Sequence, residues 1–331
     1  MKTKKAVVGI DISKAYFDVC IRRKKQEKHA VFENHKQGHQ AFIKWLKKEG
    51  MKQGDICMEA TGSLWQDLAE RLYDEGYQVF VVNPYRIKKF REHHLHRNKT
   101  DMEDARLIAQ FCQKEAEEMT FWRPMSEENK ELRAMVRRLD ELKQMKQNDE
   151  LRLKDGVRNT IVLQDLMEHI AWLKQRIRDL EMRIDEHIAR CPKIKRNMRL
   201  LVTIPGIGKT TAIIILAEVE YIGEFYKASH FAAYCGLNPT RNTSGTSIWK
   251  QSKVSKQGRS GLRKCFYMPA LVALKHNPMI MELDKRMTAS GHARMEIVVA
   301  AMKKLAHQVY GVLKNQTPFD PDYAAKFAIS S

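Results

Sequence analysis

The chain has 331 residues, enough for two or three domains with sizeable cores, and it carries 59 Lys and Arg against 40 Asp and Glu. The net charge of +19 favours a polyanionic partner, nucleic acid before an anionic membrane. The longest apolar run, Ala212–Ala217, is too short to span a bilayer, and the chain starts toward a strand rather than a signal-peptide core. Six scattered cysteines without a C-x-x-C pair argue against structural zinc and disulfides, and favour reduced thiols in the cytoplasm.

The first third of the sequence contains both strand-like and helix-like stretches. Three strand-type stretches come first, and two further strands then alternate with amphipathic helical stretches. This order predicts an α/β domain in which helices cover a mixed sheet. The expected strands are residues 6–11, 15–22, 28–33, 55–60 and 78–83, and the expected helices are 38–48, 64–77, 86–94 and 101–118.

Four acidic residues of this region form a candidate metal site. Thr100 fits the N-cap of a capping box, so a helix is expected to begin with Asp101 and Asp104 on one face. Asp11 lies in an apolar strand and Glu59 near the end of another, where a carboxylate is costly unless something binds it. Because such a sheet can make these two neighbours, we predict one four-carboxylate site for Mg²⁺ or Mn²⁺. The alternative is that the two later acids only start a solvated helix.

Residues 121–192 are expected to form a helical segment between two domains. Ser126 can cap a first helix, and apolar residues then recur at three- and four-residue spacing in two stretches. The pattern predicts two long helices in a coiled-coil hairpin, or a coiled coil between subunits; a plain helical bundle is the alternative. The apolar positions are Leu132, Val136, Leu139 and Leu142, then Leu166, Ile170, Leu173, Ile177, Leu180, Ile184 and Ile188.

The stretch Leu200–Thr211 is similar to a phosphate-binding loop but lacks its first glycine. Counting back from the G-K-T at 208–210, that glycine would be residue 203, which is Thr203. An ATP-binding loop is therefore disfavoured. The P-G-I-G sequence fits the turn of a helix-hairpin-helix, in which Gly206 and Gly208 would let backbone amides approach a nucleic-acid phosphate. The alternative is a glycine turn between two core helices.

Residues 225–281 contain no Asp or Glu but nine Lys and Arg, which indicates a polyanion-binding surface. Within this stretch, Ser244 stands beside a glycine and among cations that would stabilise the transition state of phosphoryl transfer. Ser244 is therefore a candidate nucleophile, with Ser247 a close competitor and Tyr234 a weaker one. An ordinary turn serine is the alternative.

Six stretches carry a resemblance to a known family: GIDISK around Asp11, MEATG around Glu59, NKTDMEDAR around Asp101 and Asp104, IPGIG at 204–208, FAAYCGLNPTRNTSGTS at 231–247 and SKQGRSGLRKCFYMPA at 255–270. Together they resemble the DEDD transposases of the one-ten insertion-sequence family, relatives of the pilin-gene invertase that are now called bridge-RNA-guided recombinases. The resemblance covers nearly the whole chain, and all four acids agree with the family pattern.

The resemblance implies a RuvC-like domain of RNase H-like fold at residues 1–120, the coiled-coil segment at 121–192 and a mainly helical serine transposase domain at 193–331. It implies that the four acids bind Mg²⁺ and that Ser244 forms a 5′-phosphoserine link to DNA. By the same resemblance, the protein is a tetramer with composite sites, and a structured noncoding RNA pairs with donor and target DNA. A bacterial, nucleoid-associated location in the cytoplasm is also implied.

Basic and glycine residues of these motifs are expected to contact nucleic acid. They are Lys99, Arg106, Gly206, Gly208, Lys209, Arg241, Lys250, Lys253, Lys256, Arg259, Arg263 and Lys264. Two competing interpretations stay open. A hydrolytic nuclease similar to a junction resolvase would use the four acids with water and leave no covalent adduct. A non-catalytic nucleic-acid-binding protein would keep the acids as structural residues and cleave nothing.

Overall fold

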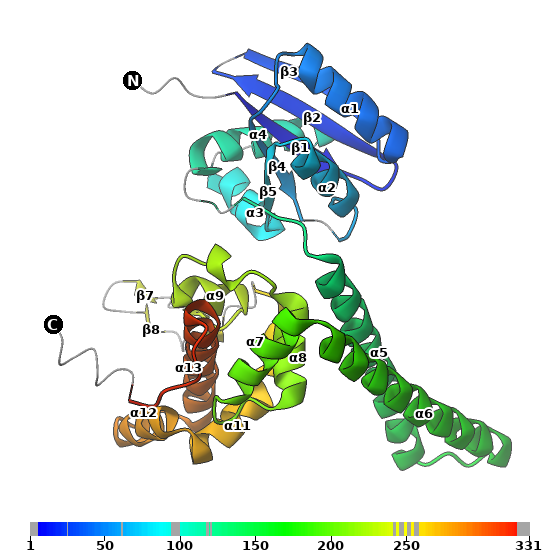
Figure 1. Ribbon diagram of the computed structural model, residues 1–331, viewed down its shortest axis with the longest axis vertical. Helices are drawn as coiled ribbons and strands as arrows, with labels where there is room; N and C mark the ends of the chain where they lie inside the picture. The colour runs from blue at the N-terminus through cyan, green and yellow to red at the C-terminus, as the bar shows by residue number, and fades with distance from the viewer. Residues whose placement is uncertain are drawn as a thin grey trace. The chain divides into compact units, whose positions relative to one another are not determined.

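The computed structural model describes residues 6–24, 26–60, 62–93, 100–116, 119, 121–240, 243–244, 248–249, 253–254 and 258–322 (Figure 1). The chain divides into two compact units, Met1–Pro124 and Met125–Ser331. The expected division into three parts, after residues 120 and 192, stays a prediction.

The first unit is a five-stranded mixed sheet, as predicted from the sequence, and the structure shows the strand order β3-β2-β1-β4-β5. The first three strands are antiparallel, while β4 and β5 run parallel to β1. Helices cover both faces, so the strands are rich in apolar residues on both sides. The strands are β1 Val7–Ile12, β2 Tyr16–Arg23, β3 Gln26–Glu33, β4 Asp55–Glu59 and β5 Gln78–Val82, and the helices are α1 Lys36–Lys48, α2 Gln66–Asp74, α3 Pro84–His93 and α4 Asp101–Glu115.

The alternation of residues along β1 assigns its two faces to different helices. Val8 and Ile10 join the core beneath α1 and α2, whereas Val7 joins the core beneath α3 and α4. Gly9 points to the α4 side, and a Cβ atom built there would lie 2.2 Å from Ala109 N and 2.3 Å from Ala105 O. The absence of a side chain at Gly9 therefore lets α4 lie directly on β1.

The start of α4 agrees with the capping prediction. Thr100 is the N-cap, and its side chain accepts a hydrogen bond from Glu103 N at 3.2 Å. Asp101, Glu103 and Asp104 occupy the first turn. The helix ends at Glu115, three residues before the expected residue 118.

The second unit begins with two long helices, α5 Glu127–Lys154 and α6 Thr160–Arg190, that pack against each other as a hairpin. Residues of the predicted apolar pattern form the contact: Leu142 meets Leu173 and Ile177, and Leu132 lies in one core with Ile184. Of the arrangements that the sequence allowed, the described chain shows a hairpin within one subunit.

The remainder of the second unit is mainly helical, with one core built largely around the buried side of α13. Between α9 and α10, the residues that the structure describes form four two-residue strands. The elements are α7 Pro192–Val202, α8 Lys209–Glu218, the 3₁₀ helix η2 Ile222–Glu224, α9 Ala228–Tyr234, β6 Pro239–Thr240, β7 Thr243–Ser244, β8 Ile248–Trp249, β9 Lys253–Val254, α10 Ser260–Cys265, α11 Tyr267–His276, α12 Pro278–Ala289 and α13 Arg294–Asn315.

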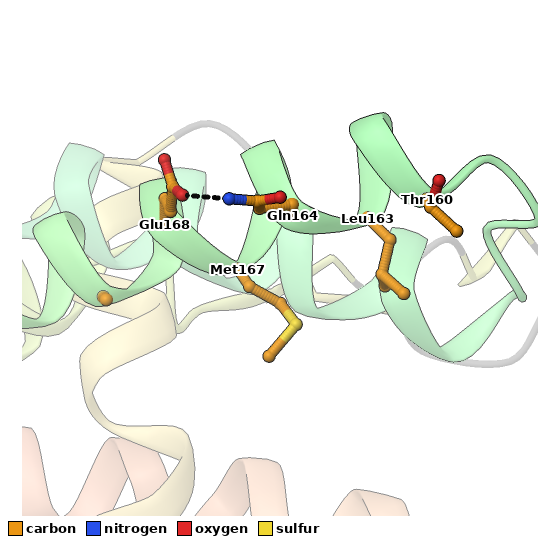
Figure 2. A pocket seen from close by; sticks show the side chains of 6 residues that line it. Thr160, Leu163, Gln164, Met167 and Glu168 are labelled. Atoms are coloured by element: carbon orange, nitrogen blue, oxygen red, sulfur yellow. Dashed lines mark hydrogen bonds between the residues drawn. The ribbon is translucent and has the colours of Figure 1, made fainter.

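The N-terminal part of α6 leaves apolar side chains exposed. Met167 is 58% exposed and Trp172 is 52% exposed. A shallow pocket here is lined by Thr160, Leu163, Gln164, Met167, Glu168 and Ala171. Figure 2 shows Leu163 and Met167 pointing to the same side of the helix, while Gln164 donates a hydrogen bond to Glu168 (2.9 Å).

Candidate active site

The strand register gathers acidic residues at one end of the sheet. Asp11 on β1 pairs with Asp18 on the antiparallel β2. On the other side, Ile10 pairs with Met58 of the parallel β4, so Glu59, the next residue of β4, lies beside Asp11. Because α4 lies on this same face, its first turn brings Asp101 and Asp104 toward the strand acids.

The pKa of Asp11 reflects this crowding of negative charge. Burial raises it most, and the charges of Asp104, Glu59, Asp101 and Asp18 raise it further, from 3.8 to about 6. The other three sequence-predicted acids therefore all lie within electrostatic reach of Asp11. Their oxygen-only donor set is the kind that Mg²⁺ and Mn²⁺ prefer.

The acids are not drawn together as tightly as one shared ion would require. Oxygens on one Mg²⁺ lie at most about 4.2 Å apart, twice a bond of about 2.1 Å. Among the described residues, the group of three ligand-type side chains with donor atoms all within 4.8 Å is Cys20, Glu27 and His29, not these acids. Metal binding by the four acids stays a prediction.

A guanidinium group lies at the acids. Arg91 on α3 places Nη2 2.6 Å from Asp104 Oδ1, and both side chains are largely covered, at 26% and 13% exposed. This contact offsets part of the negative charge. Sequence reasoning did not identify Arg91, because nothing in the spacing of α3 indicates which α4 residue it meets.

Asp18 is a fifth acid that the sequence analysis missed. Burial raises its pKa most, and the charge of Asp101 adds to the effect. Counting the register across the predicted hairpin of residues 6–22 would have found Asp18 opposite Asp11.

The structure gives only a backbone position for the predicted nucleophile. Ser244 lies on β7 and pairs with Ile248 of β8. Burial raises the pKa of the Tyr234 phenol, which disfavours this competitor as a nucleophile. Lys253 lies on β9 with its side chain undescribed. The other predictions in this stretch, Ser247, Arg241, Lys250 and Lys256, lie outside the described residues, as does Lys99.

The glycine turn between α7 and α8 has a packing reason of its own. Gly206 has φ +105°, and a Cβ there would lie 2.8 Å from both Ala273 Cβ and Pro269 O on α11. This agrees with the alternative of a turn between core helices. At the N-cap of α8, Gly208 has open space around it. A phosphate contact at either glycine stays a prediction.

Several of the cationic residues predicted to bind nucleic acid form ion pairs with carboxylates of the chain. Lys209 Nζ lies 2.6 Å from Asp185 Oδ2, Arg106 contacts Glu27 and Glu103, and Lys264 Nζ lies 3.8 Å from Asp140 Oδ1. Arg106 therefore links its own helix, α4, to Glu27 on β3. By contrast, Arg263 Nη1 is buried without a hydrogen-bond partner in the described part of the chain.

Sequence comparisons identify relatives along most of the chain. Residues 8–161 match the family DEDD_Tnp_IS110, described as a transposase, and residues 198–285 match the transposase IS116/IS110/IS902 family. The pilin gene-inverting protein of Moraxella bovis is 31% identical over 319 residues, which cover 96% of this chain and 98% of that protein. The transposase of insertion sequence element IS1111A from Coxiella burnetii is 22% identical over 303 residues, covering 82% and 78%.

The DEDD transposase family implies dependence on a divalent metal ion and DNA as the substrate. Among the described helices, none combines the length and apolar character needed to cross a bilayer. The sheet bearing clustered acids, the helical second unit and the full-length match to a DNA-inverting relative agree with one another. The chain belongs to the IS110 family of transposases, and it is a DNA transposase or recombinase.

Proposed function

We propose that this protein is a serine recombinase of its insertion element, guided by a structured RNA, which cuts and rejoins donor and target DNA. The observation that carries the proposal is the convergence of acids around Asp11 in a chain whose relatives include a pilin gene-inverting protein. DNA inversion needs strands to be rejoined as well as cut, which a covalent intermediate provides without ATP.

Asp11, Glu59, Asp101 and Asp104 would hold Mg²⁺ or Mn²⁺ in the proposed mechanism. A divalent ion bound there supplies Lewis-acid stabilisation for in-line displacement at phosphorus. The Ser244 hydroxyl loses its proton, its oxygen bonds to phosphorus, and the bond from phosphorus to the 3′ oxygen breaks. The 3′ oxygen takes up a proton, and a 5′-phosphoserine remains. Attack by the 3′ hydroxyl of another strand reverses these steps and frees the serine.

RNA guidance rests on the family resemblance and on charge. A net charge of +19 suits a protein that holds RNA together with two DNA duplexes. Self-association, expected as a tetramer, is supported by the exposed apolar side chains of α6 around Met167 (Figure 2).

The deciding experiment is an adduct assay with purified protein, the element's flanking RNA, labelled DNA and Mg²⁺, followed by SDS and a denaturing gel. The wild type is expected to give a protein–DNA adduct that Ser244→Ala abolishes while DNA binding persists. Ser247→Ala is the matched control and should retain the adduct. Asp104→Asn should remain folded and form none.

Other outcomes would overturn parts of this proposal. An adduct that survives in Ser244→Ala but not in Ser247→Ala would move the nucleophile. Clean cleavage without any adduct would favour hydrolysis similar to that of a junction resolvase. Full activity of Asp104→Asn in Mg²⁺ would remove that residue from the site.

A further inference from the structure

Three arginines converge on one carboxylate in the second unit. Glu218, the last residue of α8, meets Arg137 at both oxygens, with Nε–Oε1 at 3.0 Å and Nη2–Oε2 at 3.2 Å. Its Oε2 also lies 3.2 Å from Arg133 Nη2 and 2.6 Å from Arg259 Nη1. No other described carboxylate comes within 4.0 Å of these guanidinium groups. The arginine cluster, Arg133, Arg137 and Arg259, therefore has two positive charges in excess.

The protonation tendencies in the arginine cluster agree with this excess. Burial works to raise the pKa of Glu218, but the hydrogen bond from Arg137 and the charges of Arg133 and Arg259 lower it overall. Burial lowers the pKa of Arg133; the charge of Glu218 opposes this, but the charges of Arg259 and Arg137 add to the lowering. In addition, Arg133 Nε is buried without a partner among the described atoms. Glu218 alone thus leaves positive charge in the arginine cluster without a counter-charge and the Arg133 Nε donor without a hydrogen bond.

The cluster lies where the segment that bears Ser244 begins and ends. Arg259 stacks over the Tyr234 ring, with its Cζ 5.1 Å from the ring centroid, and its backbone N donates a hydrogen bond to Tyr234 O at 2.9 Å. Next to these residues, a Cβ on Gly258 would lie 2.1 Å from Gly236 N. Two glycines thus hold the segment's entry and exit side by side at the arginine cluster.

We propose that the arginine cluster binds a backbone phosphate of DNA at the base of the Ser244 segment. Guanidinium groups bind phosphate with the same forked geometry that they use for carboxylate, so Glu218 would hold them in position until phosphate takes over part of their hydrogen bonding. Arg137 is 53% exposed and Arg259 is 38% exposed, which leaves both accessible. The inference rests on the proposed function and adds α5, outside the acid-free stretch, to its DNA-binding surface.

The test measures DNA binding by metal-free, full-length protein in EDTA, using a fluorescent duplex at several salt concentrations. Arg137→Gln should weaken binding about five- to tenfold near 0.1 M salt and reduce the slope of log K against log salt by about 1. Arg138→Gln is the matched control, since Arg138 is 51% exposed on the same helix but pairs with Glu141. Identical slopes and affinities for the two variants would overturn the proposal.

Glu218→Gln separates phosphate binding from a purely structural network. Removing the competing charge should tighten DNA binding while thermal unfolding shows that the protein is folded. Weaker binding by a folded Glu218→Gln would overturn the proposal; if this variant fails to fold, the Arg137 comparison decides. An RNA duplex of equal length is titrated in parallel, and a slope change confined to RNA would overturn the assignment to DNA.

The binding assay is independent of strand cleavage, so the two proposals can fail separately. A normal adduct in Arg137→Gln together with an unchanged salt slope would reject the arginine cluster alone. If Arg137→Gln changes the salt slope but the wild-type protein never forms an adduct, the serine mechanism is rejected and the phosphate site is kept.

Discussion

Arg91 and Asp104 form a covered ion pair at the acid cluster, with Nη2 and Oδ1 2.6 Å apart. Burial, followed by the neighbouring carboxylates, raises the pKa of Asp11 to about 6, and the Arg91 guanidinium offsets part of the negative charge at Asp104. The same guanidinium competes with any cation that would bind Asp104. Arg91 therefore stabilises the metal-free site and opposes metal binding.

Arg91→Gln is expected to bind Mn²⁺ more tightly, by roughly fivefold, because it loses a competing ion pair worth about 1 kcal/mol. Isothermal titration calorimetry on the metal-free protein near neutral pH measures this change. Lys89→Gln is the control, since Lys89 lies on the same helix and pairs with Glu92. Equal or weaker Mn²⁺ binding by Arg91→Gln would show that Arg91 does not compete.

His39 makes the first unit sensitive to acid. The side chain is buried against Phe17, with its Nε2 2.9 Å from Asn34 Oδ1. Burial, ahead of the charge of Arg71, lowers the pKa of His39 from 6.5 to about 4. Between these two pKa values, His39 is protonated in the unfolded chain but neutral in the folded chain. Its contribution to folding stability is therefore complete above pH about 6.5 and is lost as the pH falls toward 4.

Between pH about 7 and about 5, protonation of His39 in the unfolded chain should cost the wild type about 2 kcal/mol of unfolding free energy. His39→Gln should not show this loss. Urea unfolding of the full-length protein at the two pH values measures the difference. The exposed His292, in the second unit, provides the control His292→Gln. A pH dependence that is the same in wild type and His39→Gln would assign the acid sensitivity to other groups.

At the scale of elements, the distance between the two pairs of acids depends on how closely α4 lies on β1. Gly9 sets that distance, because backbone atoms of Ala105 and Ala109 occupy the space where its Cβ would be. The N-cap at Thr100 then fixes which turn of α4 reaches the end of β1. Helix packing and capping together deliver Asp101 and Asp104 to the strand acids.

Gly9→Ala is expected to push α4 away from β1, lowering the unfolding free energy by about 2–3 kcal/mol and abolishing adduct formation. The clash is with backbone, which cannot rotate aside. Gly54→Ala is the matched control, since its Cβ would lie 2.8 Å from the flexible end of Met51 and 3.5 Å, an ordinary contact distance, from Ala6 O. Urea unfolding and the adduct assay read out both variants. A Gly9→Ala protein with wild-type stability would disprove this role of the glycine.

At the scale of the whole molecule, the acids and Ser244 belong to different compact units. The proposed chemistry needs both units at one phosphodiester, whether they come from one copy or from two. A two-copy arrangement also gives a use to the exposed apolar side chains of α6.

Mixing Asp104→Asn protein with Ser244→Ala protein is expected to restore part of the adduct that neither forms alone, because intact acids and an intact serine can then meet from different copies. The denaturing-gel assay measures recovery, and light scattering verifies that mixed assemblies form. A mixture of Ser244→Ala with Asp11→Asn tests the same point with the acid on β1. No recovery within mixed assemblies would place both units of each site in one copy.

The sequence alone predicted the elements of the first unit and the two long helices of the second, and it left open whether these two helices pack within one chain. Short runs of strand-type apolar residues mark the strands, a spacing of three to four marks the buried side of the helices, and the Thr100 cap marks where α4 begins. The motifs around Asp11, Glu59 and Asp104 also sufficed to name the candidate acids and the family.

Tertiary structure decided which residues meet. Helix packing brought Arg91 of α3 to Asp104 of α4. The convergence of α5 arginines on Glu218 joins residues about eighty positions apart, and Gly206 proved to be required by α11. Such pairings depend on how elements pack rather than on local spacing. A sequence therefore reveals the chemical groups of this protein, while the fold determines their neighbours and hence their charge, exposure and role.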